Sequence, residues 1–169
     1  MIRISTALPL SLAAALVAVV ALPSSASAAT TDLVYSCVEG SADPVNLTYS
    51  VTISAPETAT RGTNIPLTVT ATKPAPADIP AKGIDGTMEI RYSGAASGKV
   101  TASGLVNAQA VPKGQPLVLG PGKASVPATT AGVYKFAAGA RFDMKLWVGE
   151  TLSCTRKADG PSLAQTVVK

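Results

Sequence analysis

The amino-acid sequence predicts an all-β protein: one antiparallel β-sandwich of about seven to nine strands, preceded by a cleaved signal peptide. Three observations carry this prediction. An apolar run stands near the amino terminus, apolar and polar residues alternate further along, and 14 glycines and 13 prolines separate the alternating stretches. No stretch beyond the apolar run shows a helical period. Short alternating runs at regular spacing, separated by glycine and proline, are typical of β-sandwiches.

Residues 1–28 are expected to be a secretory signal peptide. A positively charged start precedes an apolar stretch at residues 8–22, and Ala26-Ser27-Ala28 follows as a small-x-small cleavage motif. We expect cleavage after Ala28, with Ala29 as a near-equal alternative, and a single domain over residues 29–169. The apolar stretch is shorter than the ~20 residues of a transmembrane helix. The sequence therefore predicts a secreted protein without a membrane anchor, either free or associated with the cell wall.

Period-two alternation predicts the early strands. Residues 33–39 form the first, and residues 45–54 and 65–72 alternate most clearly. Successive side chains of a strand point to opposite faces, so the apolar set of each strand should be buried. Pro66 lacks an N–H and is expected at a strand start or a sheet edge. The residues expected inward are Leu47, Tyr49, Val51 and Ile53 in one strand, and Ile65, Leu67, Val69 and Ala71 in the other.

Glycine and proline place the later elements. The proline-rich residues 73–86 are expected to be a loop, and residues 94–104 a hairpin. Gly120-Pro121-Gly122 is expected to be a turn, and a second turn near Gly139 should join two strands. Tyr134 follows a glycine as in a tyrosine corner, although plain core packing is the simpler interpretation. The expected strands are residues 88–92, 105–111, 117–119, 133–138, 141–148, 152–155 and 163–168.

Cys37 and Cys154 are the only two cysteines of the chain. Two cysteines in an exported protein normally pair, and here the bond would join the first strand to a late one. A loop of this length corresponds to about 4–5 kcal/mol of stabilisation in the chain-entropy account. A free nucleophilic cysteine is the alternative, but it needs a neighbouring base, and none is evident.

The residue types that most catalytic and metal sites need are scarce. The chain has no histidine, which excludes Ser-His-Asp triads and histidine-ligated zinc. No phosphate-binding loop is present, and we expect no cofactor, no metal ion and no enzyme activity. Ser97 and Lys99 match a Ser-Lys dyad, but a turn of small residues explains them better. Asp143 with Glu150 is a carboxylate pair that ordinary surface charges explain more simply.

The charge balance is mildly basic, with 14 basic and 10 acidic residues. The basic residues are scattered singly along the chain. Nucleic-acid binders concentrate them in a patch or a known motif, so we expect no nucleic-acid partner. The expected partner is an extracellular protein or glycan.

The only tryptophan, Trp147, lies on the polar face of its expected strand, together with Asp143 and Lys145. Exposed tryptophan is a common anchor in protein and sugar recognition. These three residues are therefore the candidate binding residues. The alternative is that a loop, such as residues 73–86, covers the indole.

Four segments carry a resemblance to known proteins: residues 34–37 (VYSC), 47–51 (LTYSV), 55–62 (APETATRG) and 66–69 (PLTV). The chain resembles small secreted proteins of high-GC actinobacteria such as Streptomyces, over residues 30–169. Those proteins also place one cysteine at the mature start and another near the end. The resemblance implies an immunoglobulin-like β-sandwich with no agreed activity, and it assigns no functional residues.

Three function classes follow from these expectations. The leading one is a non-enzymatic, secreted or cell-envelope-associated module that binds a protein or glycan. The second is a secreted inhibitor or toxin-like factor that presents residues 73–86 to an extracellular partner. The third is a hydrolase that uses carboxylates, with Asp143 and Glu150 as the pair to test.

Overall fold

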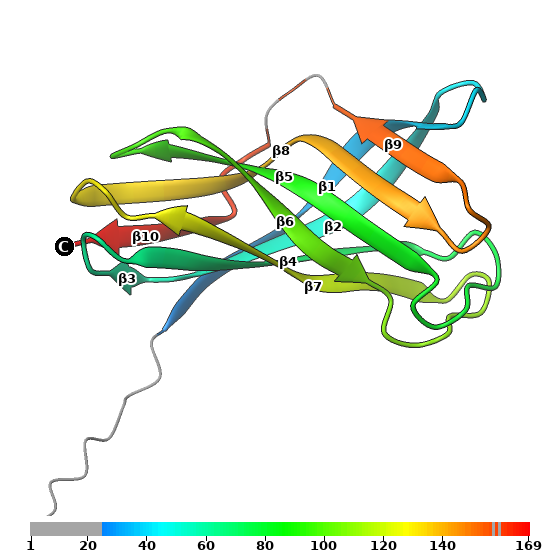
Figure 1. Ribbon diagram of the computed structural model, residues 1–169, viewed down its shortest axis with the longest axis horizontal. Helices are drawn as coiled ribbons and strands as arrows, with labels where there is room; N and C mark the ends of the chain where they lie inside the picture. The colour runs from blue at the N-terminus through cyan, green and yellow to red at the C-terminus, as the bar shows by residue number, and fades with distance from the viewer. Residues whose placement is uncertain (1–24, 157, 159) are drawn as a thin grey trace, which may run out of the picture.

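The computed structural model describes residues 25–156, 158 and 160–169, which form β-strands, turns and loops without a helix. Figure 1 shows these strands as one elongated body. The all-β prediction is therefore confirmed. The strands are β1 (Ala26–Glu39), β2 (Val45–Pro56), β3 (Thr58–Ala59), β4 (Asn64–Pro74), β5 (Ile84–Gly94), β6 (Gly98–Val106), β7 (Pro116–Pro127), β8 (Gly132–Leu146), β9 (Thr151–Thr155) and β10 (Ala164–Val168).

The expected signal peptide lies almost wholly outside the described residues, which begin at Ser25. The expected cleavage site after Ala28 falls inside β1, where Ala26 to Ala29 pair with Pro56 to Ile53 of β2. The cleavage position stays a prediction.

All ten strands belong to one hydrogen-bonded sheet. Antiparallel pairings run β1–β2–β4–β7–β6–β5–β8–β9 and return from β9 to β1, so the sheet closes on itself. The short β3 and β10 are parallel to each other, and β10 pairs with the first half of β8, on the edge whose second half pairs with β9. In Figure 1, β5 and β6 cross in front of β1 and β2. The inward faces of these strands enclose the core.

The alternation predicted for the early strands is confirmed. In β2, Tyr49, Val51 and Ile53 are buried and Leu47 is half-buried, while the residues between them are more exposed. In β4, Ile65, Leu67, Val69 and Ala71 are all buried. Pro66 lies near the start of β4, where only β7 pairs with it.

The turn expected near Gly139 is wrong, because β8 runs through it without a break from Gly132 to Leu146. The register of β8 against β5 shifts between Met88 and Ile90. The Glu89 side chain occupies the space beside Gly139, where an added Cβ would clash with Glu89 Oε1. The Ala140 N–H donates to the same oxygen at 3.1 Å. The glycine therefore accommodates a side chain in a bulge.

The turn expected at Gly120-Pro121-Gly122 is also wrong, because β7 continues through these residues with a cis Gly120–Pro121 peptide. Gly120 has a φ of +123°, and an added Cβ would lie 2.7 Å from the carbonyl oxygen of Val69. Glycine is needed here because β4 and β7 change register beside it.

Three boundaries differ from expectation: two predicted loops are partly strand, and one predicted strand is mostly loop. The segment between β4 and β5 comprises residues 75–83, which is shorter than the expected loop 73–86. β6 ends at Val106, so most of the expected strand 105–111 is a loop. Within it, Val111 forms an isolated bridge with Ile79. β3 was not expected, since residues 55–64 were assigned to a connection.

The predicted disulfide between Cys37 and Cys154 is present and buried. The two residues lie directly opposite each other in the β1–β9 ladder. Cys154 also pairs with Phe142 of β8 on the other side of β9. The bond therefore links β1 to β9 at the point where β9 also pairs with β8.

The core next to the disulfide is aromatic. Tyr35, Tyr49 and Phe142 are each no more than 2% exposed, and their rings meet edge to face with centroids 5.1–6.3 Å apart. Further away, Tyr134 is fully buried and its Oη accepts the Thr130 N–H at 3.2 Å. This bond to backbone just upstream has the form of a tyrosine corner.

Candidate functional site

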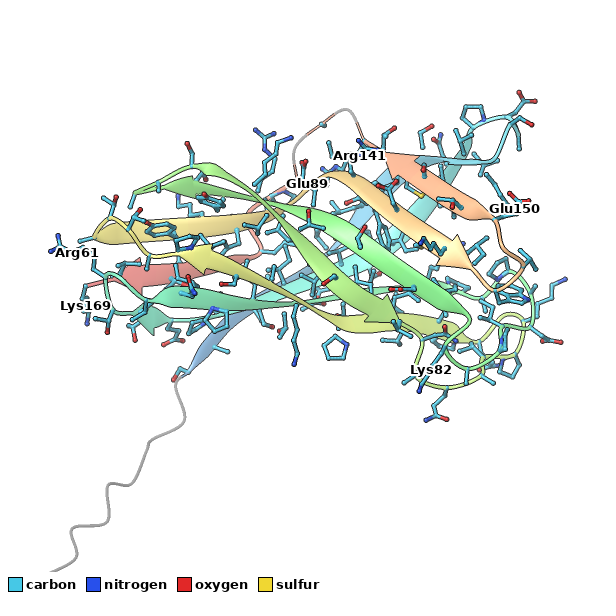
Figure 2. The ribbon with its side chains drawn as sticks, in the orientation of Figure 1. Arg61, Lys82, Glu89, Arg141, Glu150 and Lys169 are labelled. Atoms are coloured by element: carbon cyan, nitrogen blue, oxygen red, sulfur yellow. A yellow bond between two sulfur atoms is a disulfide. The ribbon has the colours of Figure 1, made fainter. Side chains whose placement is uncertain are left out.

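A cavity of about 290 Å³ lies at one end of the closed sheet. Strands β1, β4 and β8 finish at this end, and β2, β5, β7 and β9 start there, so each contributes its terminal residues. The loop 75–83 adds Pro76 and Ile79. Lys82 and Glu150 mark this end in Figure 2, and Arg61 and Lys169 mark the opposite end. The lining is mainly apolar and includes Leu47, Tyr49, Ile84, Met144, Leu146 and Trp147.

The turn after β8 places Trp147 at the rim. β8 ends at Leu146, and its alternation stops there. The Leu146 N–H donates to the Glu150 carbonyl and the Gly149 N–H donates to the Leu146 carbonyl, each at 2.9 Å. This tight turn leaves Trp147 43% exposed and Val148 60% exposed. An indole that is part of an apolar wall and still meets solvent is suited to contact a ligand.

Buried polar contacts hold the loop 75–83 in place as the facing wall. Asn107 is 1% exposed, and its Oδ1 accepts the Ile84 N–H at 2.9 Å. Its Nδ2 donates to the carbonyls of Pro80 and Gln109, at 2.7 and 2.9 Å. The buried amide is thus fully engaged, which fixes the loop relative to β5 and β6. Hydrogen bonds within the fold therefore set the position of this wall.

Tyr49 and Lys73 are neighbours in the lining of the cavity. The Tyr49 hydroxyl donates to the Met144 sulfur at 3.9 Å. The Lys73 ammonium lies over the Tyr49 ring, 5.6 Å from its centroid, which is the range of a cation–π contact. Burial lowers the pKa of Lys73 from its ordinary value. One cation therefore belongs to a mainly apolar lining, in which Glu39 is the other charged residue.

Of the three residues that the sequence singled out for binding, only Trp147 lines this cavity. Asp143 lies on the outward face of β8, where its Oδ2 is 3.7 Å from Arg141 Nε. Lys145 is exposed on the same face, between Asp85 of β5 and Thr151 of β9. The structure does not bring Asp143 and Lys145 to the candidate site.

Sequence reasoning missed Tyr49 and Lys73 as site residues. Tyr49 was assigned to the core, and its ring is indeed buried. Lys73 was assigned to a loop, although it continues the period-two set of Ile65 to Ala71. A lysine at the next core-facing position was the signal that could have identified it.

A second cavity, of about 410 Å³, lies on the outer face of β5, β6 and β8 and includes Ser97 and Lys99. Lys99 Nζ donates to Glu89 Oε2 at 2.9 Å. Burial opposes ionisation of Glu89, but Lys99 and the Ala140 N–H outweigh it and lower the pKa of this carboxyl. Among the described residues no hydrogen bond joins Ser97 to Lys99. The arrangement is that of an ion pair beside a hairpin.

No group of three or more metal-ligating side chains occurs in the described part of the chain. Within residues 25–156, 158 and 160–169, no helix is long and apolar enough to span a membrane.

No protein-family model, curated protein or solved structure matches this chain. The geometry of the site therefore carries the functional argument alone.

Proposed function

We propose that this protein is a secreted or cell-envelope-associated, non-enzymatic binding module that holds an apolar group of its ligand in the end cavity. The observation that carries the proposal is the solvent-exposed indole of Trp147 on an apolar cavity at the end of the sheet. Cavities of this kind usually orient a ligand by apolar contact and a few polar groups. The mainly apolar lining favours an apolar side chain or tail over the hydroxyl-rich surface of a glycan.

Burial of apolar surface would drive the binding. Each methylene that leaves water contributes about 0.8 kcal/mol, and a buried tryptophan contact often contributes more than 2 kcal/mol in interfaces. A rigid cavity adds to this, because little conformational entropy is lost on binding. The hydrogen bonds of Asn107 supply such rigidity for one wall.

The secreted location and the immunoglobulin-like sandwich are part of the proposal. A buried disulfide is consistent with an extracellular protein. The Thr130–Tyr134 bond and the aromatic contacts between strands on opposite sides of the core support a sandwich arrangement of the single sheet. The signal peptide is supported by the sequence pattern alone.

The alternative of a secreted inhibitor or toxin-like factor would use the loop 73–86 as its contact element. Here Ala75 and Ile79 of that loop are buried, and Asp78 accepts the Lys113 N–H at 2.8 Å. Of this loop, Pro76 and Ile79 line the cavity. This observation favours the binding module.

We predict that Trp147→Ala lowers ligand capture at least about tenfold, because the aromatic contact at the rim of the cavity is lost. The measurement is recovery of protein and glycan from cell-envelope fractions on immobilised wild type and variant. Val133→Ala is the matched control, since Val133 is 40% exposed on the opposite end of β8. Capture by wild type and control but not by Trp147→Ala is the expected result. Equal capture by all three proteins, or capture by none, would contradict the proposal.

A further inference from the structure

Lys73 occupies a core-facing position at the end of β4. The residues at alternate positions before it, Ile65 to Ala71, are buried apolar side chains. In register, Lys73 lies opposite Leu117 of β7, another residue of the cavity lining. A strand directs every second side chain to the same face, so the backbone itself aims this lysine toward the cavity.

The ammonium of Lys73 has no carboxylate partner. Among the described residues, no ion pair includes it, and its one noted contact is with the Tyr49 ring. Glu39 also lines the cavity, but it lies at the end of β1, and β2 separates β1 from β4. The Ser50–Thr72 and Asp32–Ser50 pairs place Lys73 level with residues 32–33 of β1, so Glu39 lies about six residues, or ~20 Å, further along that strand. Asp32 lines an outer cavity together with Lys73, but it accepts a hydrogen bond from Ser50 and forms no ion pair with Lys73. Among the described residues, the ammonium therefore has no carboxylate within ion-pair distance.

The Tyr49 hydroxyl is a second underused polar group. Tyr49 lines the cavity and is almost fully buried, and its hydroxyl has a thioether sulfur as its acceptor. Thioether sulfur is a weak acceptor, and burial raises the pKa of Tyr49, which keeps the phenol a donor. Two donors, one of them charged, therefore lie beside the apolar lining.

The size of the cavity bounds the ligand. A volume of about 290 Å³ is near the lower end of ligand cavities. It corresponds to roughly ten groups of the volume of a water molecule, ~30 Å³ each. A methylene group is of similar size, so the volume of the cavity matches that of an unbranched chain of about eight to ten carbons.

We propose that the end cavity binds an alkyl carboxylate of this length, with the tail against the apolar lining and Trp147 and the carboxylate on Lys73. The inference rests on the proposed function and adds the chemical class of the ligand. Charge complementarity supports it, because an anion supplies the partner that Lys73 lacks. An uncharged chain of equal length gains the apolar contacts alone.

The test is a titration with decanoate and, separately, with decanol at pH 7, followed by intrinsic fluorescence. Trp147 is the only tryptophan, so the signal reports this cavity. We expect wild type to bind decanoate about tenfold more tightly than decanol, the magnitude of one charge-assisted hydrogen bond. Lys73→Met should remove this preference, while Lys73→Arg should retain most of it.

The control is Lys123→Met, which removes an exposed lysine of β7 outside the cavity lining. It should bind decanoate as wild type does, and circular dichroism checks that every variant is folded. Equal affinity of wild type for decanoate and decanol, or an unchanged preference in Lys73→Met, overturns the carboxylate inference and leaves the binding module standing. If neither decanoate nor decanol binds, both the carboxylate inference and the proposed binding of apolar groups in the end cavity are contradicted.

Discussion

Replacing Cys37 and Cys154 together with alanine is expected to lower the free energy of unfolding by about 4–5 kcal/mol. The bond closes a loop between residues 117 positions apart, and chain entropy predicts a contribution of this size for such a loop. Both cysteines are fully buried. Alanine is chosen instead of serine because serine would place an unpaired hydroxyl in the core. The loss is large beside a typical net stability of about 5–15 kcal/mol.

Urea denaturation followed by far-UV circular dichroism measures this loss. Ser36→Ala with Ser153→Ala is the matched control, because these residues neighbour the cysteines on β1 and β9 without forming the bond. The control should change the stability by about 0.5 kcal/mol or less. A loss below about 1 kcal/mol in the cysteine variant would show that the β1–β9 ladder closes the sheet without the covalent link.

Phe142→Ala is expected to cost about 3–5 kcal/mol, the range for removing a buried phenylalanine. Phe142 is fully buried in β8, and its ring meets Tyr35 and Tyr49 at centroid distances of 6.0 and 5.1 Å. Its backbone pairs with Met88 on one side and Cys154 on the other. The substitution therefore leaves a cavity in the core between β5, β8 and β9, next to the disulfide.

The same denaturation experiment tests this prediction. Phe142→Leu should lose less than alanine does, because part of the volume is kept. Val133→Ala, on the exposed face of β8, should stay within about 0.5 kcal/mol of wild type. Equal and small losses of stability in all three variants would contradict a large contribution of this aromatic cluster to the free energy of unfolding.

Local alternation was enough to predict several strands and their buried faces. β2 and β4 follow it closely, because each has one face in the core along most of its length. The turns predicted from glycine and proline were wrong at two places, because there the glycine makes room for a segment that is distant in the sequence. Gly139 makes room for Glu89, which is 50 residues earlier in the chain, and Gly120 makes room for the Val69 carbonyl. Such contacts leave no trace in the local pattern.

The site was predictable only in part for the same reason. Trp147 was found because it is the only tryptophan and breaks the pattern of its strand. Lys73 was hidden by the prolines that follow it, which suggested a loop. The cavity itself exists because β9 pairs with both β1 and β8, and this closure joins residues more than 100 positions apart. A sequence pattern does not reveal which end of the closed sheet stays open.

A map of amide chemical shifts during titration with decanol tests the central claim most directly, because the probe carries no charge and reports apolar binding alone. If the end cavity binds apolar groups, the largest shifts will fall on residues around it, including Leu47, Ile84, Leu146 and Trp147. Shifts that gather instead on the outer-face cavity near Ser97 and Lys99, or the absence of any saturable shift, would contradict the account.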